Sequence, residues 1–358
     1  MSQSSTQSRS RKRDYASSIS GSSLTGKTKS TTPYSAEFEQ KLIDRGVYPD
    51  GYRAREGAKP SKPANMKEMQ EALVQARSSL SPSKVSEEVF EEFQDNNRRA
   101  KSESTAMADV IPMITGVKDR QFETAGDIPF NNLQRFDPEL SVPKPDKYYG
   151  ARPDQIDERV RNDLDQYIVP STSKQRPAAP NFFLEGKGAS GRPDVAQRQA
   201  SYDGAVGARA MWQLQNYGEP EVEHDDKAYT MSATYHLGTG TLQMFATHPK
   251  CSGSRTEYCT TQIDGYYMIG TSENFRKGAT AYRNARDWTR QQRDRLITNA
   301  NAVAQNLSPQ TQSTSQSKTT LEMSSTPGTA SFSSDTSADE LALDQGTATK
   351  RRRPVATD

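Results

Sequence analysis

The stretch NFFLEGKG, residues 181–188, decides the fold and the candidate chemistry of this chain. Its first five residues form a short, mostly apolar run that predicts a buried strand. Pro193 then begins a helix that we expect to run to about Tyr217. Because side chains alternate along a strand, Glu185 and Lys187 are predicted to share one face and to converge on one ligand.

The segments around this strand change from helical to alternating periodicity along the chain. Before the strand, helices are predicted over 37–44, 66–76, from Ser86 onward, and 154–167. After the helix that follows it, we expect a hairpin of 228–236 and 241–248, a strand over 257–269 and a helix over 272–306. This order predicts an α+β fold with a small mixed sheet flanked by helices, and not repeated βαβ units.

The composition indicates one folded unit between polar ends. Of the 358 residues, 32% are hydrophobic, whereas soluble globular domains are roughly 45–50% apolar. The polar residues concentrate in Ser/Thr-rich segments, 1–33 and 307–358, which we expect to be disordered tails. The folded domain is predicted at 34–306, with a helical N-terminal part over about 34–120 and the core over about 121–306.

Several classes of protein are excluded by the same sequence. The chain begins MSQSSTQSRSRKR and has no apolar run of spanning length, so secretion and membrane insertion are not expected. Cys251 and Cys259 are too few for a disulfide scaffold, which favours a reducing compartment. The net charge of +2 hides basic clusters near both ends, one at 11–13 and one made of Lys350, Arg351, Arg352 and Arg353. Such clusters are typical of nuclear import, so a nuclear location is predicted, with the cytoplasm as the alternative.

Three apparent motifs are weaker indications. Residues 21–28 fit the P-loop pattern but lack the strand and helix that it needs. Residues 186–191 fit G-x-G-x-x-G in the right context. The hairpin expected next, however, is antiparallel and supplies no parallel strand with a ribose-binding acid, which disfavours dinucleotide binding. The histidines at 224, 236 and 248 do not have metal-ligand spacing.

Another set of residues fits metal-assisted hydrolysis of phosphodiesters. Asp146 follows Pro145 at the start of a Tyr/Gly-rich segment, and Glu185 and Lys187 end the predicted strand. Two carboxylates at the edge of a sheet can bind Mg²⁺, and a nearby lysine can stabilise the charge that develops on phosphorus. The plain structural alternative is an ordinary ion pair at the end of a strand.

This pattern resembles the PD-(D/E)XK superfamily of restriction-endonuclease-like proteins. More closely, the chain is similar to an uncharacterised family of filamentous fungi described as PD-(D/E)XK nuclease-like. The resemblance covers about 34–305 and is carried by YYGARP at 148–153, RQASYDGAVGARAM at 198–211 and FRKGATAYRNARDW at 275–288, beside NFFLEGKG. It implies a restriction-endonuclease-like core and a Mg²⁺ site, in which Asp146 and Glu185 hold the metal and Lys187, Gln199 and Tyr202 complete the catalytic set.

The chain departs from the superfamily pattern in ways that leave alternatives open. Asp146 and Glu185 are separated by a long charged segment, so Asp127 or Asp137 is an alternative first aspartate. The superfamily's Gln-x-x-x-Tyr motif is one residue shorter here, as Gln199-x-x-Tyr202. An acid from the first core helix often joins such a metal site, and the candidates are Glu88 and Glu92.

The last predicted helix carries a series of arginines at near-heptad spacing, which are Arg276, Arg283, Arg286, Arg290 and Arg293. A basic stripe of this kind can follow a phosphate backbone, so DNA or RNA is a candidate partner. The alternative is a solvated face offset by nearby acids. The function expected is a Mg²⁺-dependent nuclease or a nuclease-derived nucleic-acid binder, and the alternative is an inactive scaffold that binds protein in the nucleus.

Overall fold

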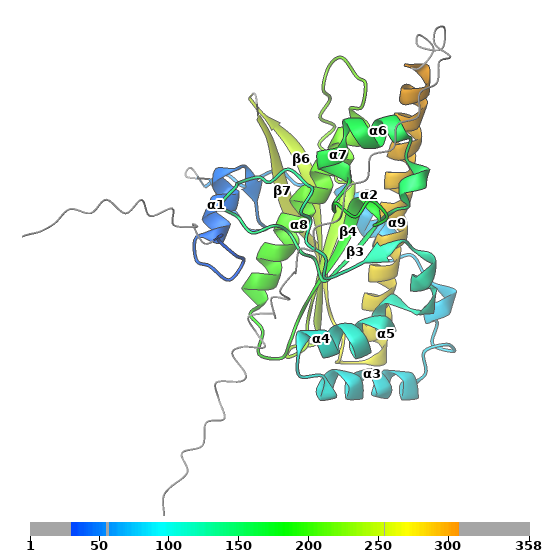
Figure 1. Ribbon diagram of the computed structural model, residues 1–358. Coiled ribbons are helices and arrows are strands. Elements are labelled where there is room, and N and C mark those ends of the chain that lie inside the picture. Colours follow the sequence, from blue (N-terminus) through cyan, green and yellow to red (C-terminus); the bar gives the residue numbers. More distant parts are fainter. Residues whose placement is uncertain (1–29, 55–56, 254, 308–358) are drawn as a thin grey trace, which may run out of the picture.

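The computed structural model describes residues 30–54, 57–253 and 255–307. Its centre is a mixed sheet of seven strands in the order β1-β7-β6-β5-β4-β3-β2, flanked by helices, which confirms the predicted α+β class (Figure 1). The strands are β1 Val47–Tyr48, β2 Thr124–Ala125, β3 Lys147–Ala151, β4 Ala178–Lys187, β5 Thr230–His236, β6 Thr241–Ser252 and β7 Arg255–Tyr267. The β4–β5 and β1–β7 pairs are parallel, and the remaining neighbours are antiparallel.

Two long helices cover opposite faces of this sheet, α8 (Pro193–Gln215) on one and α9 (Ser272–Asn306) on the other (Figure 1). Successive side chains of β4 point alternately toward α9 and toward α8. Phe182 packs against Tyr282 of α9 at a centroid distance of 5.0 Å. Phe183, in contrast, belongs to a second core cluster that includes Tyr202 of α8. All ten residues of β4 are buried, which explains the continuous apolar run seen in the sequence.

Shorter helices surround these layers. They are α1 Phe38–Asp44, α2 Met66–Leu73, α3 Glu87–Arg99, α4 Glu103–Thr105, a π-helical turn at Ala106–Val110, α5 Ile111–Thr115, α6 Glu158–Asp163 and α7 Asp165–Ile168. Three 3₁₀ turns lie at Ser78–Leu80, Val117–Gln121 and Pro153–Gln155. In Figure 1 the helices α3, α4 and α5 lie together near one end of the sheet.

Small residues allow α8 to approach the sheet closely. A Cβ atom on Gly207 would lie 2.7 Å from the ring of Phe183 and 3.0 Å from the Pro180 carbonyl oxygen. One on Gly204 would lie 2.3 Å from Thr247 Oγ1. Because real Cβ atoms do not come this close to other atoms, both positions require glycine, which explains why the block at 198–211 is rich in small residues.

Two expectations about the secondary structure are wrong. The single helix predicted over 154–167 is a 3₁₀ turn followed by α6 and α7, because Asp157 caps α6 and Leu164 leaves helical geometry at φ −105° and ψ 17°. The second wrong expectation is that no parallel strand follows β4. The hairpin of β5 and β6 is present as predicted, but β5 pairs in parallel with β4. The 23 residues of α8 provide the crossover that a parallel pair needs, so β4, α8 and β5 form one βαβ unit.

The N-terminal part joins the same sheet and core as the rest of the domain. Thr31 bridges to Leu140, β1 pairs with β7, and Met69 of α2 shares a cluster with Trp288 of α9. The tails predicted at 1–33 and 307–358 lie almost wholly outside the described residues, as do the P-loop match and the cluster Lys350, Arg351, Arg352 and Arg353. Within the part of the chain that the structure describes, no helix is long and apolar enough to cross a membrane.

Candidate functional site

Asp146 and Glu185 lie opposite each other on adjacent antiparallel strands. The β3–β4 register pairs Lys147 with Leu184, so the next pair outward is Asp146 with Glu185, on one face of the sheet. The Asp146 amide donates a hydrogen bond to Glu185 Oε1 at 3.2 Å, and the Gly186 amide donates one to Asp146 Oδ2 at 2.7 Å. Each carboxylate is therefore held by the backbone of the other strand.

The long segment between these two acids does not separate them, because it forms α6 and α7 at the other end of the strands. The alternative aspartates have other partners. Asp127 is exposed and pairs with Lys144 at 2.6 Å, and Asp137 pairs with Arg45 at 2.8 Å. Of the three aspartates considered from the sequence, Asp146 is the one in contact with β4.

Lys187 is buried on the same strand, with an exposed fraction of 1%, and its Nζ atom pairs with Glu103 Oε2 at 2.8 Å. Glu103 begins α4, directly after the N-cap residue Ser102. Sequence reasoning missed this acid. Glu88 and Glu92, the helix acids considered instead, are exposed on α3.

A second missed acid, Asp203 of α8, completes the cluster. It is buried, and its carboxyl group shares a hydrogen bond with that of Glu185. The sequence contained a signal for it, since Asp203 is the one charged residue in the run of small and apolar residues from Ala200 to Ala208. An acid in such a buried helix face needs a polar partner.

The predicted helix residues Gln199 and Tyr202 take different positions. Gln199 lies one helical turn before Asp203, and its Oε1 atom is buried with no partner among the described residues. Tyr202 is directed toward α1 and packs edge-on against Phe38 at 5.7 Å. The structure thus brings together Asp146, Glu185 and Lys187, whereas the ring of Tyr202 is a core contact.

The electrostatics of this acidic cluster, defined as Asp146, Glu185, Asp203, Glu103 and Lys187, show an excess of negative charge. Burial raises the pKa of Asp146, and repulsion by Glu185 and then Glu103 raises it further. Burial and the Asp203 carboxylate raise the pKa of Glu185, and burial raises that of Asp203 to about 7. For Lys187, burial lowers the pKa, but the surrounding carboxylates outweigh this effect and the net shift is upward. Four carboxyl groups surround one ammonium group, so a proton or a cation stabilises the cluster.

The carboxylates of Asp146 and Glu185 fit Mg²⁺, which needs few protein ligands, better than they fit a metal whose ligands all come from the protein. Among the described residues, no group of three or more His, Cys, Asp or Glu side chains is arranged as a metal site. Mg²⁺, however, is usually held by one or two carboxylates together with water and substrate phosphates. The buried Oε2 atom of Glu185 has no partner within the described part of the chain, and Asp146 is partly exposed beside it. Asp146 and Glu185 are therefore the residues that would hold such an ion.

The predicted arginine stripe on α9 is not an exposed surface. Arg286 and Arg293 have exposed fractions of 2% and 4%. Arg283 and Arg286 donate to the carbonyl oxygens of the last residues of α5, which are Met113, Ile114 and Thr115. These arginines cap the C-terminus of α5, where cations are favoured. Of the five predicted arginines, Arg286 and Arg293 are therefore buried, and Arg276, Arg283 and Arg290 are partly exposed.

The glycine-rich loop after β4 is covered by protein. A Cβ atom on Gly188 would lie 3.3 Å from the Lys101 carbonyl oxygen and 3.4 Å from the Glu103 amide nitrogen. His236 Nε2 lies 2.9 Å from the Gly191 carbonyl oxygen. The parallel strand β5 does follow, but Gly188 packs against this chain's own backbone at Lys101 and Glu103, which leaves no room there for a pyrophosphate.

These features define an α+β protein in which a buried acidic cluster with one lysine joins two adjacent strands of a mixed sheet. The chain belongs to the family described as Domain of unknown function (DUF7924), whose family model matches residues 66–300. No curated protein and no solved structure matches the chain. The matched residues contain the whole acidic cluster, whereas α1 and β1 precede them.

Proposed function

We propose that this protein is a Mg²⁺-dependent phosphodiesterase of the nuclease type, acting on DNA or RNA. The observation that carries the proposal is the pairing of Asp146 and Glu185 across two strands, with Lys187 on the same face. The resemblance to PD-(D/E)XK proteins assigns the same three residues, and it supports a restriction-endonuclease-like core.

The roles follow from the chemistry of each group. Asp146 and Glu185 would hold the ion, which would supply Lewis-acid stabilisation of the charge that develops on the phosphate. Lys187 presents its ammonium group to the phosphate oxygens once its ion pair with Glu103 opens. Asp203 lies against Glu185 and raises the pKa of that carboxyl group, so it favours the protonated form of Glu185 while no ion is bound.

Access to the site requires movement of the segment that covers it. Glu185 and Lys187 are buried, and a Cβ atom on Gly186 would lie 3.2 Å from the sulfur of Met107. Met107 belongs to the π-helical turn at Ala106–Val110, a geometry that is often found at functional sites. We expect Glu103 and this π-helical turn to move aside when the site opens.

The decisive experiment measures metal binding and cleavage on the full chain. Calorimetric titration with Mg²⁺ or Mn²⁺ is paired with incubation of single- and double-stranded DNA and RNA. Glu185→Gln and Asp146→Asn should each lose metal binding and cleavage. The matched control Glu92→Gln, an exposed acid on α3, should retain both. Equal turnover by the wild type and both site variants would mean that cleavage comes from elsewhere, and no metal binding by the wild type would overturn the proposal.

The ion pair between Lys187 and Glu103 favours a second candidate, a catalytically inactive nuclease-like scaffold that binds a protein partner. In that case the lysine serves as a structural cation, and the wild type binds no divalent metal at millimolar concentrations. A stable partner recovered by pull-down, with no retardation of any nucleic acid at low salt, would favour the scaffold.

Nuclear location is a separate proposal that rests on the basic clusters near the chain ends. Replacing Lys350, Arg351, Arg352 and Arg353 with alanine in a fluorescently tagged chain should shift the protein to the cytoplasm. An unchanged distribution would contradict it.

A further inference from the structure

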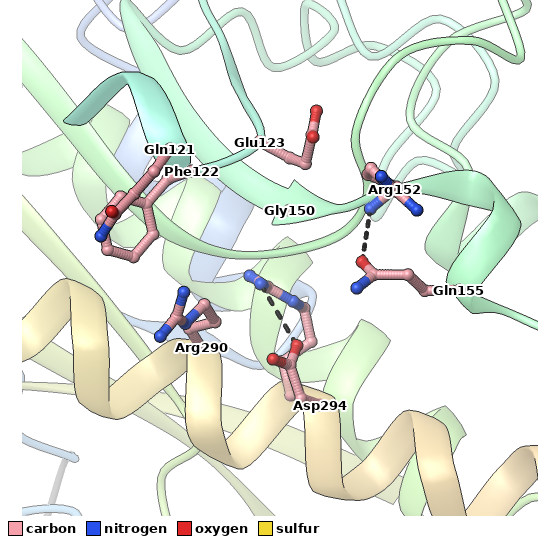
Figure 2. Close-up of a pocket in the computed structure, with 9 residues that line it drawn as sticks. Gln121, Phe122, Glu123, Gly150, Arg152, Gln155, Arg290 and Asp294 are labelled. Atoms are coloured by element: carbon pink, nitrogen blue, oxygen red, sulfur yellow. Dashed lines mark hydrogen bonds and ion pairs between the residues drawn. The ribbon is translucent and has the colours of Figure 1, made fainter. Parts of the chain in front are cut away.

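A pocket of ≈ 300 Å³ lies at the end of β3 remote from Asp146, between the strand and α9 (Figure 2). Its wall includes Gly150 of β3 and two residues of α9, Arg290 and Arg293, which are one helical turn apart. Arg152 is the third arginine of the lining, and Phe122 adds an aromatic ring. The pocket is therefore distinct from the acidic cluster.

Positive charge exceeds negative charge in this pocket. Its three arginines, Arg152, Arg290 and Arg293, face two acids, Glu123 and Asp294. Figure 2 shows the Glu123 side chain pointing away from α9. Arg152 is already occupied, since it forms two hydrogen bonds of 3.0 Å with Asp154.

Arg290 is the arginine that is available to a ligand. Its guanidinium lies over the ring of Phe122 at 4.8 Å from the centroid, and the guanidinium of Arg286 lies 3.8 Å from the same centroid. Among the described residues, Arg290 has no hydrogen bond and no ion pair. Stacking on the ring fixes the guanidinium while leaving its N–H groups free, an arrangement suited to binding an oxyanion.

Arg293 supplies a buried donor beside it. Its exposed fraction is 4%; Nη1 donates to Asn181 Oδ1 at 3.0 Å and Nη2 lies 3.4 Å from Asp294 Oδ1. Its Nε atom is buried and has no partner within the described part of the chain. Arg290 also repels Arg293, so two cations are held close together with a donor unsatisfied. Such a pair is stabilised when an anion binds between them.

We propose that this pocket binds a phosphoryl group, with Arg290 and Arg293 as its ligands. Two guanidinium groups from successive turns can contact different oxygens of one tetrahedral dianion. A single carboxylate has fewer oxygens and would leave more of the N–H donors of the two arginines without a partner. The phosphoryl group belongs either to a small phosphate compound or to the end of a nucleic-acid strand. The inference does not depend on the proposed nuclease activity.

The test is titration of the full chain with inorganic phosphate in EDTA, so that no divalent metal contributes. Heat of binding and the thermal shift are measured for the wild type, Arg290→Gln and the control Arg276→Gln, another partly exposed arginine of α9. Arg290→Gln should weaken phosphate binding by about tenfold or more, because it removes charge-assisted hydrogen bonds. Arg276→Gln should bind as the wild type does.

A second arm separates the two sources of the phosphoryl group. A 5′-phosphorylated trinucleotide that binds more tightly than both inorganic phosphate and its unphosphorylated form assigns the pocket to strand ends. Equal binding by the phosphorylated trinucleotide and inorganic phosphate assigns it to small phosphates, and both results support the proposal. No phosphate-dependent heat or thermal shift in the wild type, or equal phosphate affinity in Arg290→Gln, would overturn it.

Discussion

The two ends of β3 carry opposite excesses of charge. At its start, Asp146 joins three other carboxyl groups around Lys187. At its end, Arg290 and Arg293 line one pocket with Arg152, and the acids there are Asp294 and Glu123. The acids are fixed by backbone amides and by one another, so their charge is balanced by a proton or a cation. The arginines are fixed by an aromatic ring and an amide side chain, and their free donors are suited to an anion.

The largest expected effect concerns the single cation of the acidic cluster. Lys187→Met should reduce Mg²⁺-dependent cleavage by about 10²–10³-fold, because the positive charge that stabilises the phosphate in the transition state is lost. The assay compares rates under single-turnover conditions, with Lys277→Met, an exposed lysine of α9, as the control. Undiminished cleavage by Lys187→Met would mean that Lys187 takes no part in the reaction.

The next effect is on the pH dependence of stability. The folded-state pKa of Asp203 is about 7, above the ordinary value of 3.8. The unfolded chain therefore releases this proton first, and stability is lost as pH rises from about 4 to about 7. Asp203→Asn should remove up to about 4 kcal/mol of this pH-dependent loss of stability.

Urea unfolding between pH 4 and pH 8, without divalent metal, measures this difference. Asp109→Asn, an exposed acid on the nearby π-helical turn, provides the control and should keep the wild-type slope. If Asp203→Asn shows the same slope as the wild type, Asp203 is not the group that holds the proton.

A smaller effect is expected from opening the ion pair over the site. Glu103→Gln should lower stability by about 1–3 kcal/mol, because Lys187 loses one of its partners but keeps Asp146 and Glu185 nearby. The same change should increase nucleic-acid binding in EDTA several-fold, as measured by fluorescence anisotropy. A loss of nucleic-acid binding would instead show that Glu103 supports the site.

The smallest effect concerns the arginine end of the strand. Asp294→Asn removes the acid that pairs with Arg293, so phosphate binding should tighten by about three- to fivefold. Its direction is opposite to that of Arg290→Gln, and Glu273→Gln, an exposed acid at the start of α9, is the control in the same titration. Weaker phosphate binding in Asp294→Asn would mean that Asp294 orients the arginine and does not compete for it.

The secondary structure was largely predictable from the sequence, because periodicity and capping residues act locally. The predicted bounds of the last helix agree with α9, and those of the helix after Pro193 lie within two residues of α8. The sequence also singled out Asp146, Glu185 and Lys187, which the structure brings together, although the sequence predicts no strand after Asp146. Local patterns could not, however, show that β5 returns beside β4.

The missing members of the acidic cluster and the misread arginines have one cause. Glu103 and Asp203 reach β4 from elements that are far away in the sequence, and neither has a local motif. The spacing of Arg283 and Arg286 correctly places them on one side of a helix. It does not reveal that α5 lies against that side and uses them to cap its carbonyl groups.

Both edges of the seven-stranded sheet are formed by strands of only two residues, β1 and β2. A two-residue strand offers few unpaired backbone groups of its own on which another chain could add a strand, although β1 covers only Tyr258 and Cys259 of the 13 residues of β7. The consequence concerns solubility, since the long hydrophobic strands β4, β5 and β6 are all interior and cannot template aggregation while the domain is folded. Because β1 precedes the matched family region, its removal would expose the backbone of β7 and create an edge prone to self-association.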